Sequence, residues 1–241
     1  MTPTKITYML KILRAIALGS LLTAPTVLAA QVVVGHTPET SPYRDITASQ
    51  RLTIFGGYFA AQPDEIGATP QSGATLGLRY SIPVAGPADF YARFERASSH
   101  REAFNPTKPA ETRSLGTQNL GVYVVDLGFD FNLTGRRTWH GLIPLVGFGL
   151  GVTSAPTTTK DDPYDFGTQF SFSVEGGIRF NPTNSYEIRL NAKPTFYQNH
   201  YPVQYFATPA GSTPLLGTST ARSGFRHAID YSAGLSLPLF R

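Results

Sequence analysis

The segment with the most evident potential for covalent chemistry contains Ser98, Ser99, His100 and Glu102. A histidine within reach of a serine hydroxyl can take its proton and make the oxygen a nucleophile. Residues adjacent on a strand or loop seldom face one another, however, and serines and histidines in polar loops are mostly solvated. The five histidines are also dispersed, without a repeated ligand spacing. We therefore predict no catalytic, metal or cofactor site, and a chain that is not an enzyme.

A second group of candidate residues consists of charged side chains at alternate positions of otherwise apolar segments. Charges enclosed in a narrow interior have to pair, because an isolated buried charge is very costly. Their signs nearly balance, which predicts a plug of ion pairs in the interior, although a narrow ion or small-solute path remains open as an alternative. The predicted network comprises Arg79, Arg93, Glu95, Asp126, Asp130, Glu175, Arg179, Glu187, Arg189, Lys193 and Asp230.

The elements that must position these charges are strands, because the pattern repeats with a period of two. Residues 169–180 show it most clearly, with Phe170, Phe172 and Val174 on one face and Ser171 and Glu175 on the other. The first of eight such segments is apolar on both faces, so its register stays open. The eight segments span residues 52–60, 75–82, 90–95, 123–132, 145–152, 169–180, 186–196 and 229–239.

The connections between these segments alternate regularly in length. The long ones are residues 61–73, 97–118, 153–166 and 198–224, and the short ones are residues 84–87, 134–140 and 181–185. Outer-membrane barrels have this arrangement, with short periplasmic turns and longer external loops. Aromatic residues also gather near both predicted ends of the strands, as two interfacial girdles would require. We predict an all-β, eight-stranded antiparallel up-and-down transmembrane barrel.

The first thirty residues have a different layout from the rest of the chain. Lys5, Lys11 and Arg14 precede an apolar stretch at residues 15–22, and small residues follow at 27–30. This order is typical of a secretory signal peptide, with cleavage expected after Ala29 or Ala30. We therefore divide the chain into a signal peptide at 1–30, a periplasmic N-terminal extension at 31–50 whose composition suits disorder, and an outer-membrane barrel at 51–241.

Composition supports a β protein without covalent or metal cross-links. The 241 residues include 23 glycines and 19 prolines but no cysteine, and only 15% of the residues are charged. A mixture poor in helix formers and rich in turn formers favours strands. The net charge of +4 is scattered rather than concentrated in a run, so we expect no nucleic-acid partner.

Two segments resemble parts of known outer-membrane barrel proteins. Residues 141–152 look like the glycine-rich strand of small barrels. The final segment resembles the terminal strand recognised by the barrel assembly machinery, although Arg241 follows its aromatic residue. The residues that carry this resemblance are Ser232, Gly234, Leu237, Leu239 and Phe240.

As an architecture, the chain resembles small eight-stranded outer-membrane barrels of the OmpA, OmpX and NspA kind. This resemblance implies a location in the outer membrane of a Gram-negative bacterium. It also implies contact with outer-membrane lipid and lipopolysaccharide and assembly by the barrel machinery. The oligomeric state is left open. Loop residues placed to contact lipopolysaccharide phosphates or a host surface are Arg101, Lys108, Arg113, Tyr201, Tyr205, Phe206, Arg222 and Arg226.

The function favoured by these patterns is a barrel with a closed, charge-filled lumen and surface-exposed loops, in a structural or surface-interaction role. Three alternatives stay open at this point. They are a narrow, porin-like channel, a lipid A-modifying enzyme, and a periplasmic lipocalin-like binder. The last would turn the apolar faces inward around a ligand.

Overall fold

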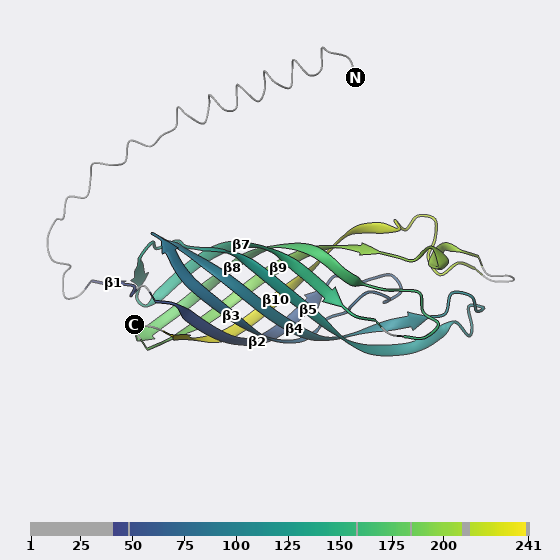
Figure 1. The fold of residues 1–241 in the computed structure, drawn as a ribbon, viewed down its shortest axis with the longest axis horizontal. Helices are drawn as coiled ribbons and strands as arrows, with labels where there is room; N and C mark the ends of the chain where they lie inside the picture. Colours follow the sequence, from purple (N-terminus) through teal and green to yellow (C-terminus); the bar gives the residue numbers. More distant parts are fainter. Residues whose placement is uncertain (1–40, 48, 158, 184, 209–212, 240–241) are drawn as a thin grey trace, which may run out of the picture. The chain divides into compact units, whose positions relative to one another are not determined.

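Eight long antiparallel strands form a closed sheet in the computed structural model, which describes residues 41–47, 49–157, 159–183, 185–208 and 213–239. Each strand pairs with the next along the chain, and the last pairs with the first (Figure 1). The predicted eight-stranded up-and-down barrel is confirmed. Its strands are β2 Arg51–Ala61, β3 Gly73–Ala85, β4 Ala88–Phe104, β5 Ser114–Asn132, β7 Leu142–Ala155, β8 Gly167–Thr183, β9 Tyr186–His200 and β10 Ser223–Pro238.

The chain divides into two units, Met1–Ser41 and Pro42–Arg241, and every described strand belongs to the second. The predicted signal peptide and residues 31–40 of the predicted extension lie outside the described residues. Within the rest of that extension, β1 Tyr43–Asp45 pairs with β6 Arg137–Trp139. The expectation of disorder is therefore wrong for this short stretch, because backbone pairing with the turn before β7 orders it.

Side chains alternate between the two faces of the sheet. On β8, Phe170 and Val174 are 66% and 49% exposed, whereas Ser173 and Glu175 are 3% and 1% exposed. The other long strands also alternate, with apolar residues on the outer face. Their inner faces are mainly polar, charged or glycine, although β2, β4, β5 and β7 also bury apolar residues such as Phe55, Tyr91, Val124 and Leu145. This orientation contradicts the lipocalin-like alternative, which needs the apolar faces inside the barrel.

The register of the first strand, which the sequence left open, follows the same alternation. Arg51, Thr53 and Phe55 are buried inside the barrel, whereas Ile54 and Tyr58 are exposed on its outer wall. Both faces of this strand carry large apolar residues, so only its pairing with β3 and β10 fixes which face is enclosed.

Glycines on the inner face make room for the enclosed ring of Tyr91. A Cβ atom on Gly128 would lie 2.7 Å from Tyr91 Cζ, and one on Gly149 would lie 2.5 Å from its hydroxyl oxygen. Both contacts are too close for any side chain. Two neighbouring strands therefore need glycine at these positions so that the narrow barrel can hold an aromatic ring.

Most connections at one end of the barrel are longer than those at the other, although residues 105–113 and residues 133–141, which lie at opposite ends, are equally long. The long-loop end carries residues 62–72, 105–113, 156–166 and 201–222, the last of which contains the 3-10 helix η1 Val203–Phe206. The short-turn end carries residues 86–87, 133–141 and 184–185. Among the described residues, no helix is long and apolar enough to cross a membrane.

The prediction of a loop at residues 97–118 is wrong for most of these residues. Residues 97–104 continue β4 and residues 114–118 belong to β5, and the two segments pair as a hairpin up to Phe104 and Ser114. Small and polar residues occupy both faces of this hairpin. The contrast between an apolar and a polar face, which predicted strands elsewhere, is therefore missing.

Candidate functional site

The interior of the barrel contains the charged residues that the sequence placed on the inner face. Among the described residues, seven basic and seven acidic residues are buried. They include all eleven of the predicted network, together with Arg51, Asp89 and Arg101. We call the set without Arg101 the lumen network. Strands β2, β3, β4, β5, β8, β9 and β10 each contribute at least one member.

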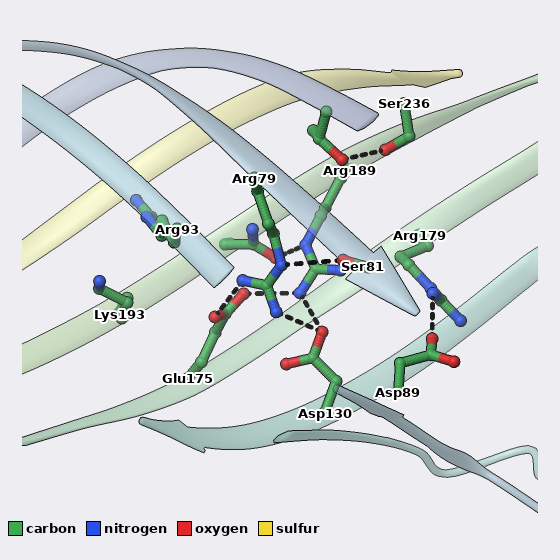
Figure 2. Close-up of polar contacts among 12 residues, drawn as sticks. Arg79, Ser81, Asp89, Arg93, Asp130, Glu175, Arg179, Arg189, Lys193 and Ser236 are labelled. Atoms are coloured by element: carbon green, nitrogen blue, oxygen red, sulfur yellow. Dashed lines mark hydrogen bonds and ion pairs between the residues drawn. The ribbon is translucent and has the colours of Figure 1, made fainter. Parts of the chain in front are cut away.

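The centre of the lumen network is a group of two arginines and two carboxylates drawn from four strands. Arg79 donates to Glu175 at 2.7 Å and to Asp130 at 2.5 Å, and Arg189 donates to the same two carboxylates at 2.7 Å each. Figure 2 shows both guanidinium groups lying between the carboxylates. Each of the four side chains therefore has two partners of opposite charge.

A second group lies beside this centre. Arg93 forms an ion pair with Glu95 at 2.9 Å and another with Asp230. The fully buried ammonium group of Lys193 pairs with Asp126 and lies 4.0 Å from Glu95. Glu95 therefore links the two cations, and charges from β4, β5, β9 and β10 meet across the lumen.

A third group extends the network on the other side of the centre. Asp89 accepts hydrogen bonds from Arg51 at 3.1 Å and from Arg179 at 2.8 Å. Figure 2 shows the bond between Arg179 and Asp89. Arg179 also donates to the side-chain oxygen of Asn132 at 2.6 Å and lies 3.6 Å from Glu187. These residues lie on strand segments next to the short turns.

Aromatic rings complete the packing of the enclosed guanidinium groups. The Arg79 guanidinium carbon lies 3.6 Å from the centre of the Tyr91 ring, and that of Arg93 lies 4.1 Å from the centre of the Phe55 ring. Cations are attracted to ring faces, and the attraction is larger where water is excluded. The rings fill space that ion pairs alone would leave open.

The energetics of such a network depend on its completeness. Transfer of each charge out of water costs several kcal/mol, and good geometry with several partners is needed to offset that cost. Loss of one partner leaves an uncompensated charge, which typically costs about 3–5 kcal/mol. The lumen network can therefore hold the strands in register and fill the barrel.

A second polar assembly lies among the long loops and was not predicted from the sequence. Its centre is Asp162, whose carboxylate forms an ion pair with Arg101 at 2.8 Å and accepts the Tyr205 hydroxyl at 2.7 Å. The Asp162 carboxylate also accepts the backbone N–H groups of Tyr164 and Phe104. One side chain from residues 156–166 thereby joins β4 to the loop that contains η1.

A parallel arrangement surrounds Asp64 in the first long loop. Asp64 accepts the Tyr201 hydroxyl at 2.5 Å and lies 3.4 Å from Arg226, which in turn donates to the Tyr201 oxygen at 2.9 Å. We call the two arrangements together the loop cluster. Its members are Asp64, Arg101, Asp162, Tyr164, Tyr201, Tyr205 and Arg226.

Burial changes the acid–base behaviour of the loop cluster. Loss of solvent, followed by the hydrogen bond to Asp162, raises the pKa of the Tyr205 phenol above its ordinary value. Loss of solvent and the bond to Asp64 likewise raise the pKa of Tyr201. Both phenols therefore stay protonated and remain hydrogen-bond donors to the carboxylates at neutral pH.

The structure separates the residues that suggested covalent chemistry. Ser99 is buried and donates to the backbone oxygen of Gln71, whereas Ser98 and Glu102 lie on the opposite, outward face of β4 with His100. All four lie on a strand, not in the loop in which the sequence placed them. No group of three or more metal-binding side chains occurs among the described residues.

The candidate surface residues of the loops also divide. Arg101, Tyr201 and Tyr205 are buried in the loop cluster, so their predicted role in contacting a surface ligand is wrong. Burial follows from the packing of the third and fourth long loops over β4. The exposed candidates are Lys108 and Arg222, while Arg113, Phe206 and Arg226 are partly buried.

The residues of the predicted assembly signal lie on or just after the last strand. Ser232 and Gly234 face the lumen, whereas Leu237 and Leu239 are exposed on the outer wall. Phe240 lies outside the described residues. Recognition by the assembly machinery stays a prediction.

No protein-family model and no curated protein matches the chain. Among solved structures, it is similar to Neisserial surface protein A, with a TM-score of 0.52 and 11% identity over 79% of this chain and 97% of that chain. The chain has the fold of a small outer-membrane β-barrel. The architectural resemblance predicted from the sequence is thus confirmed, and at this identity the likeness concerns the fold alone.

A further structural match is OprG from Pseudomonas aeruginosa. It is 12% identical to this chain, and the match covers 81% of this chain and 99% of that chain at a TM-score of 0.46. The fold assignment rests on the first match and on the closed sheet of this chain.

Proposed function

We propose that this chain is an integral outer-membrane barrel whose lumen is closed and which presents its long loops at the cell surface, in a structural or surface-interaction role without catalysis. The long-loop end would then be external and the short-turn end periplasmic. The observation that carries the proposal is the pair of polar assemblies: the lumen network inside the barrel and the loop cluster among the long loops at one end.

The outer wall supports a membrane location. Large apolar side chains are exposed on every long strand, for example Leu76 at 65% and Leu150 at 54%. An apolar surface of this extent is unusual for a water-soluble monomer. A closed sheet also satisfies its own backbone hydrogen bonds, which is the condition for strands to cross a bilayer.

Membrane fractionation with a heat-modifiability gel tests the location. We expect recovery in the outer membrane and a folded band that shifts when the sample is boiled. The intact mass of the recovered protein would show whether cleavage occurs after Ala29 or Ala30, as the proposed export route requires. A soluble periplasmic protein without a band shift would contradict the proposal.

The two assemblies support a closed lumen. The four charged side chains of the central group pair with one another across the lumen, so they fill it and do not line an open channel. They are Arg79, Asp130, Glu175 and Arg189. In a barrel of eight strands the interior is only wide enough for such side chains. Above it, the loop cluster packs with Phe59, Val122, Phe166, Leu216 and other buried apolar residues at the long-loop end.

Planar-bilayer recordings test the closure directly. Refolded protein that passes the gel test should give no stepwise conductance in bilayers where a porin control opens readily. Reproducible conductance steps from the wild-type protein would favour the narrow-channel alternative. Mass spectrometry of lipid A with and without expression tests the enzyme alternative, for which an unchanged acyl pattern is expected.

A further inference from the structure

Arg96 differs from every other basic residue of the barrel strands. Among the described residues of the eight long strands, it is the only arginine or lysine whose side chain is exposed on the outer wall: Arg226 is partly buried and the others are buried. Outward neighbours on the same strand are Phe94, which is apolar, and Ser98, which is polar. Arg96 thus marks the point on β4 where the apolar outer wall ends.

The surroundings of Arg96 place it at an aromatic level of the wall. Its Cα pairs with that of Tyr123 on β5, and its guanidinium carbon lies 5.9 Å from the centre of the Tyr123 ring. On the other side it pairs with Leu76 of β3. Tyrosines favour the boundary between hydrocarbon and headgroups, so Arg96 stands where the phosphates of the outer leaflet begin.

Arg96 has no anionic partner within the described residues. Every ion pair there involves other cations, and its ring contact with Tyr123 leaves all five N–H donors available. A cation on the lipid-facing wall is destabilising in proportion to its depth unless something neutralises it. At the headgroup boundary that cost is only about 0–1 kcal/mol, so Arg96 is tolerated there without a partner and its donors are available to an anion from outside the chain.

An apolar groove begins beside this unpaired cation. It has a volume of about 480 Å³ and is lined by Ile54, Ala74, Leu76, Leu78, Phe94 and Arg96, among others. This volume falls in the range of small-molecule sites. The lining is aliphatic and aromatic except where Arg96, Thr75 and Ser98 border one end. A cation at one end of an apolar groove matches a ligand with an anionic head and a hydrocarbon tail.

We propose that Arg96 and this groove bind one phosphate-bearing amphiphile of the outer leaflet. Its phosphate accepts hydrogen bonds from the Arg96 guanidinium, and one acyl chain lies in the groove across β2, β3 and β4. The inference rests on the proposed membrane function and deepens it by naming a lipid site. It also moves the expected lipid contact from the long loops to the barrel wall.

Native mass spectrometry in a non-ionic detergent tests the site, with lipid A that carries both phosphates as the probe. We expect wild-type protein to retain one lipid, and Arg96→Gln to bind it about tenfold more weakly, the loss expected for a charge-assisted hydrogen bond. Ala74→Phe, which fills the groove but keeps the charge, should weaken binding similarly. The matched control is Arg136→Gln, an exposed arginine at the short-turn end, which should bind as wild type.

Two further probes separate the parts of the ligand. Dephosphorylated lipid A should bind as weakly to wild type as lipid A binds to Arg96→Gln, and inorganic phosphate alone should not compete at millimolar concentration. Equal binding of lipid A to wild type and Arg96→Gln would overturn the proposal, as would full competition by free phosphate. Every variant is first checked for the heat-modifiable band. A missing wild-type band overturns the membrane function as well, whereas a normal band with unchanged binding removes only the lipid site.

Discussion

The lumen network and the loop cluster both bury charge, but they do so with different partners. In the lumen, guanidinium groups and carboxylates pair mainly with one another, as Arg79 does with Asp130 and Glu175. In the loop cluster, each carboxylate is shared between a guanidinium and a tyrosine hydroxyl, as Asp162 is between Arg101 and Tyr205. The first assembly joins strands that the barrel already holds together, and the second joins loops that have no sheet of their own.

This difference indicates how each assembly should respond to damage. The backbone pairing of eight strands fixes the lumen side chains in place, so a lost partner leaves a charge that cannot move to water. The loops can separate locally and expose their charges to solvent while the barrel stays closed. A substitution in the lumen network should therefore lower the free energy of unfolding of the whole barrel. A substitution in the loop cluster should instead let the long loops separate locally.

The largest effect is expected for Glu175→Gln. The substitution keeps the volume but removes the negative charge shared by Arg79 and Arg189, so Asp130 would be the one carboxylate left in contact with both guanidinium groups. We expect the free energy of unfolding to fall by about 3–5 kcal/mol. Urea titration in detergent micelles, followed by the fraction of the heat-modifiable band, measures it. An unchanged midpoint and slope would show that the network adds nothing to stability.

The next largest effect is expected for Asp162→Asn in the loop cluster. In either orientation the new amide nitrogen would face a backbone N–H, that of Phe104 or that of Tyr164, and the ion pair with Arg101 would be lost. Such unpaired buried groups cost about 1–3 kcal/mol, and we expect the loops to open locally so that water can solvate these groups. Hydrogen exchange should rise in residues 156–166 and 201–208, while the heat-modifiable band persists.

The matched control for that variant is Asp161→Asn. Asp161 is an exposed neighbour in the same loop, and its positive φ of 70° is one that asparagine tolerates. The control removes one negative charge from the same loop but changes no member of the loop cluster, so it should leave hydrogen exchange in residues 156–166 and 201–208 unchanged. Equal exchange in both variants would mean that Asp162 does not hold the loops together.

A smaller effect is expected from alkaline pH, and it should again distinguish the two assemblies. The pKa values of Tyr201 and Tyr205 are raised in the folded protein above the ordinary 10.0, so folding favours the neutral phenols. Their contribution is complete below about pH 10 and is lost as the pH rises through the higher folded values. The phenolate absorbance of wild type should show a late-ionising fraction that is smaller in a Tyr201→Phe, Tyr205→Phe double variant, in which the buried phenol of Tyr164, whose pKa is also raised, still ionises late. Ionisation of all phenols near pH 10 would contradict this expectation.

The same contrast explains what the sequence could predict. Alternation along a strand is local, so the period of two identified the inward face of β8 and β9 and placed Glu175, Arg179 and Arg189 in the lumen. Arg51 and Asp89 were missed because they stand at the ends of strands, one position outside the segments first assigned. Continuing the alternation of the inward positions 91, 93 and 95 would have found Asp89, whereas Arg51 also needed the register of the first segment, which the sequence left open.

Arg101 and Asp162 were missed for a different reason. Arg101 shares the phase of Arg93 and Glu95, but residues 97–104 lack an apolar face, so the strand was ended too early. Asp162 lies in a loop, where no period links sequence position to orientation. Its contacts with β4 and η1 arise only when distant loops fold over one another. A loop assembly of this kind requires the structure.

The smallest effect is expected outside both assemblies, at the ion pair that joins β1 to β6. The Arg137 Nε atom lies 3.1 Å from Asp45 Oδ1, but the side chains of Asp45 and Arg137 are 85% and 60% exposed. Water screens such a pair, and it typically contributes no more than about 1 kcal/mol. Asp45→Asn should therefore leave the urea midpoint within error of wild type when measured beside Glu175→Gln. Equal shifts of the urea midpoint in the two variants would show that burial inside the barrel does not increase the contribution of an ion pair to stability. The contrast between the lumen network and exposed pairs would then be wrong.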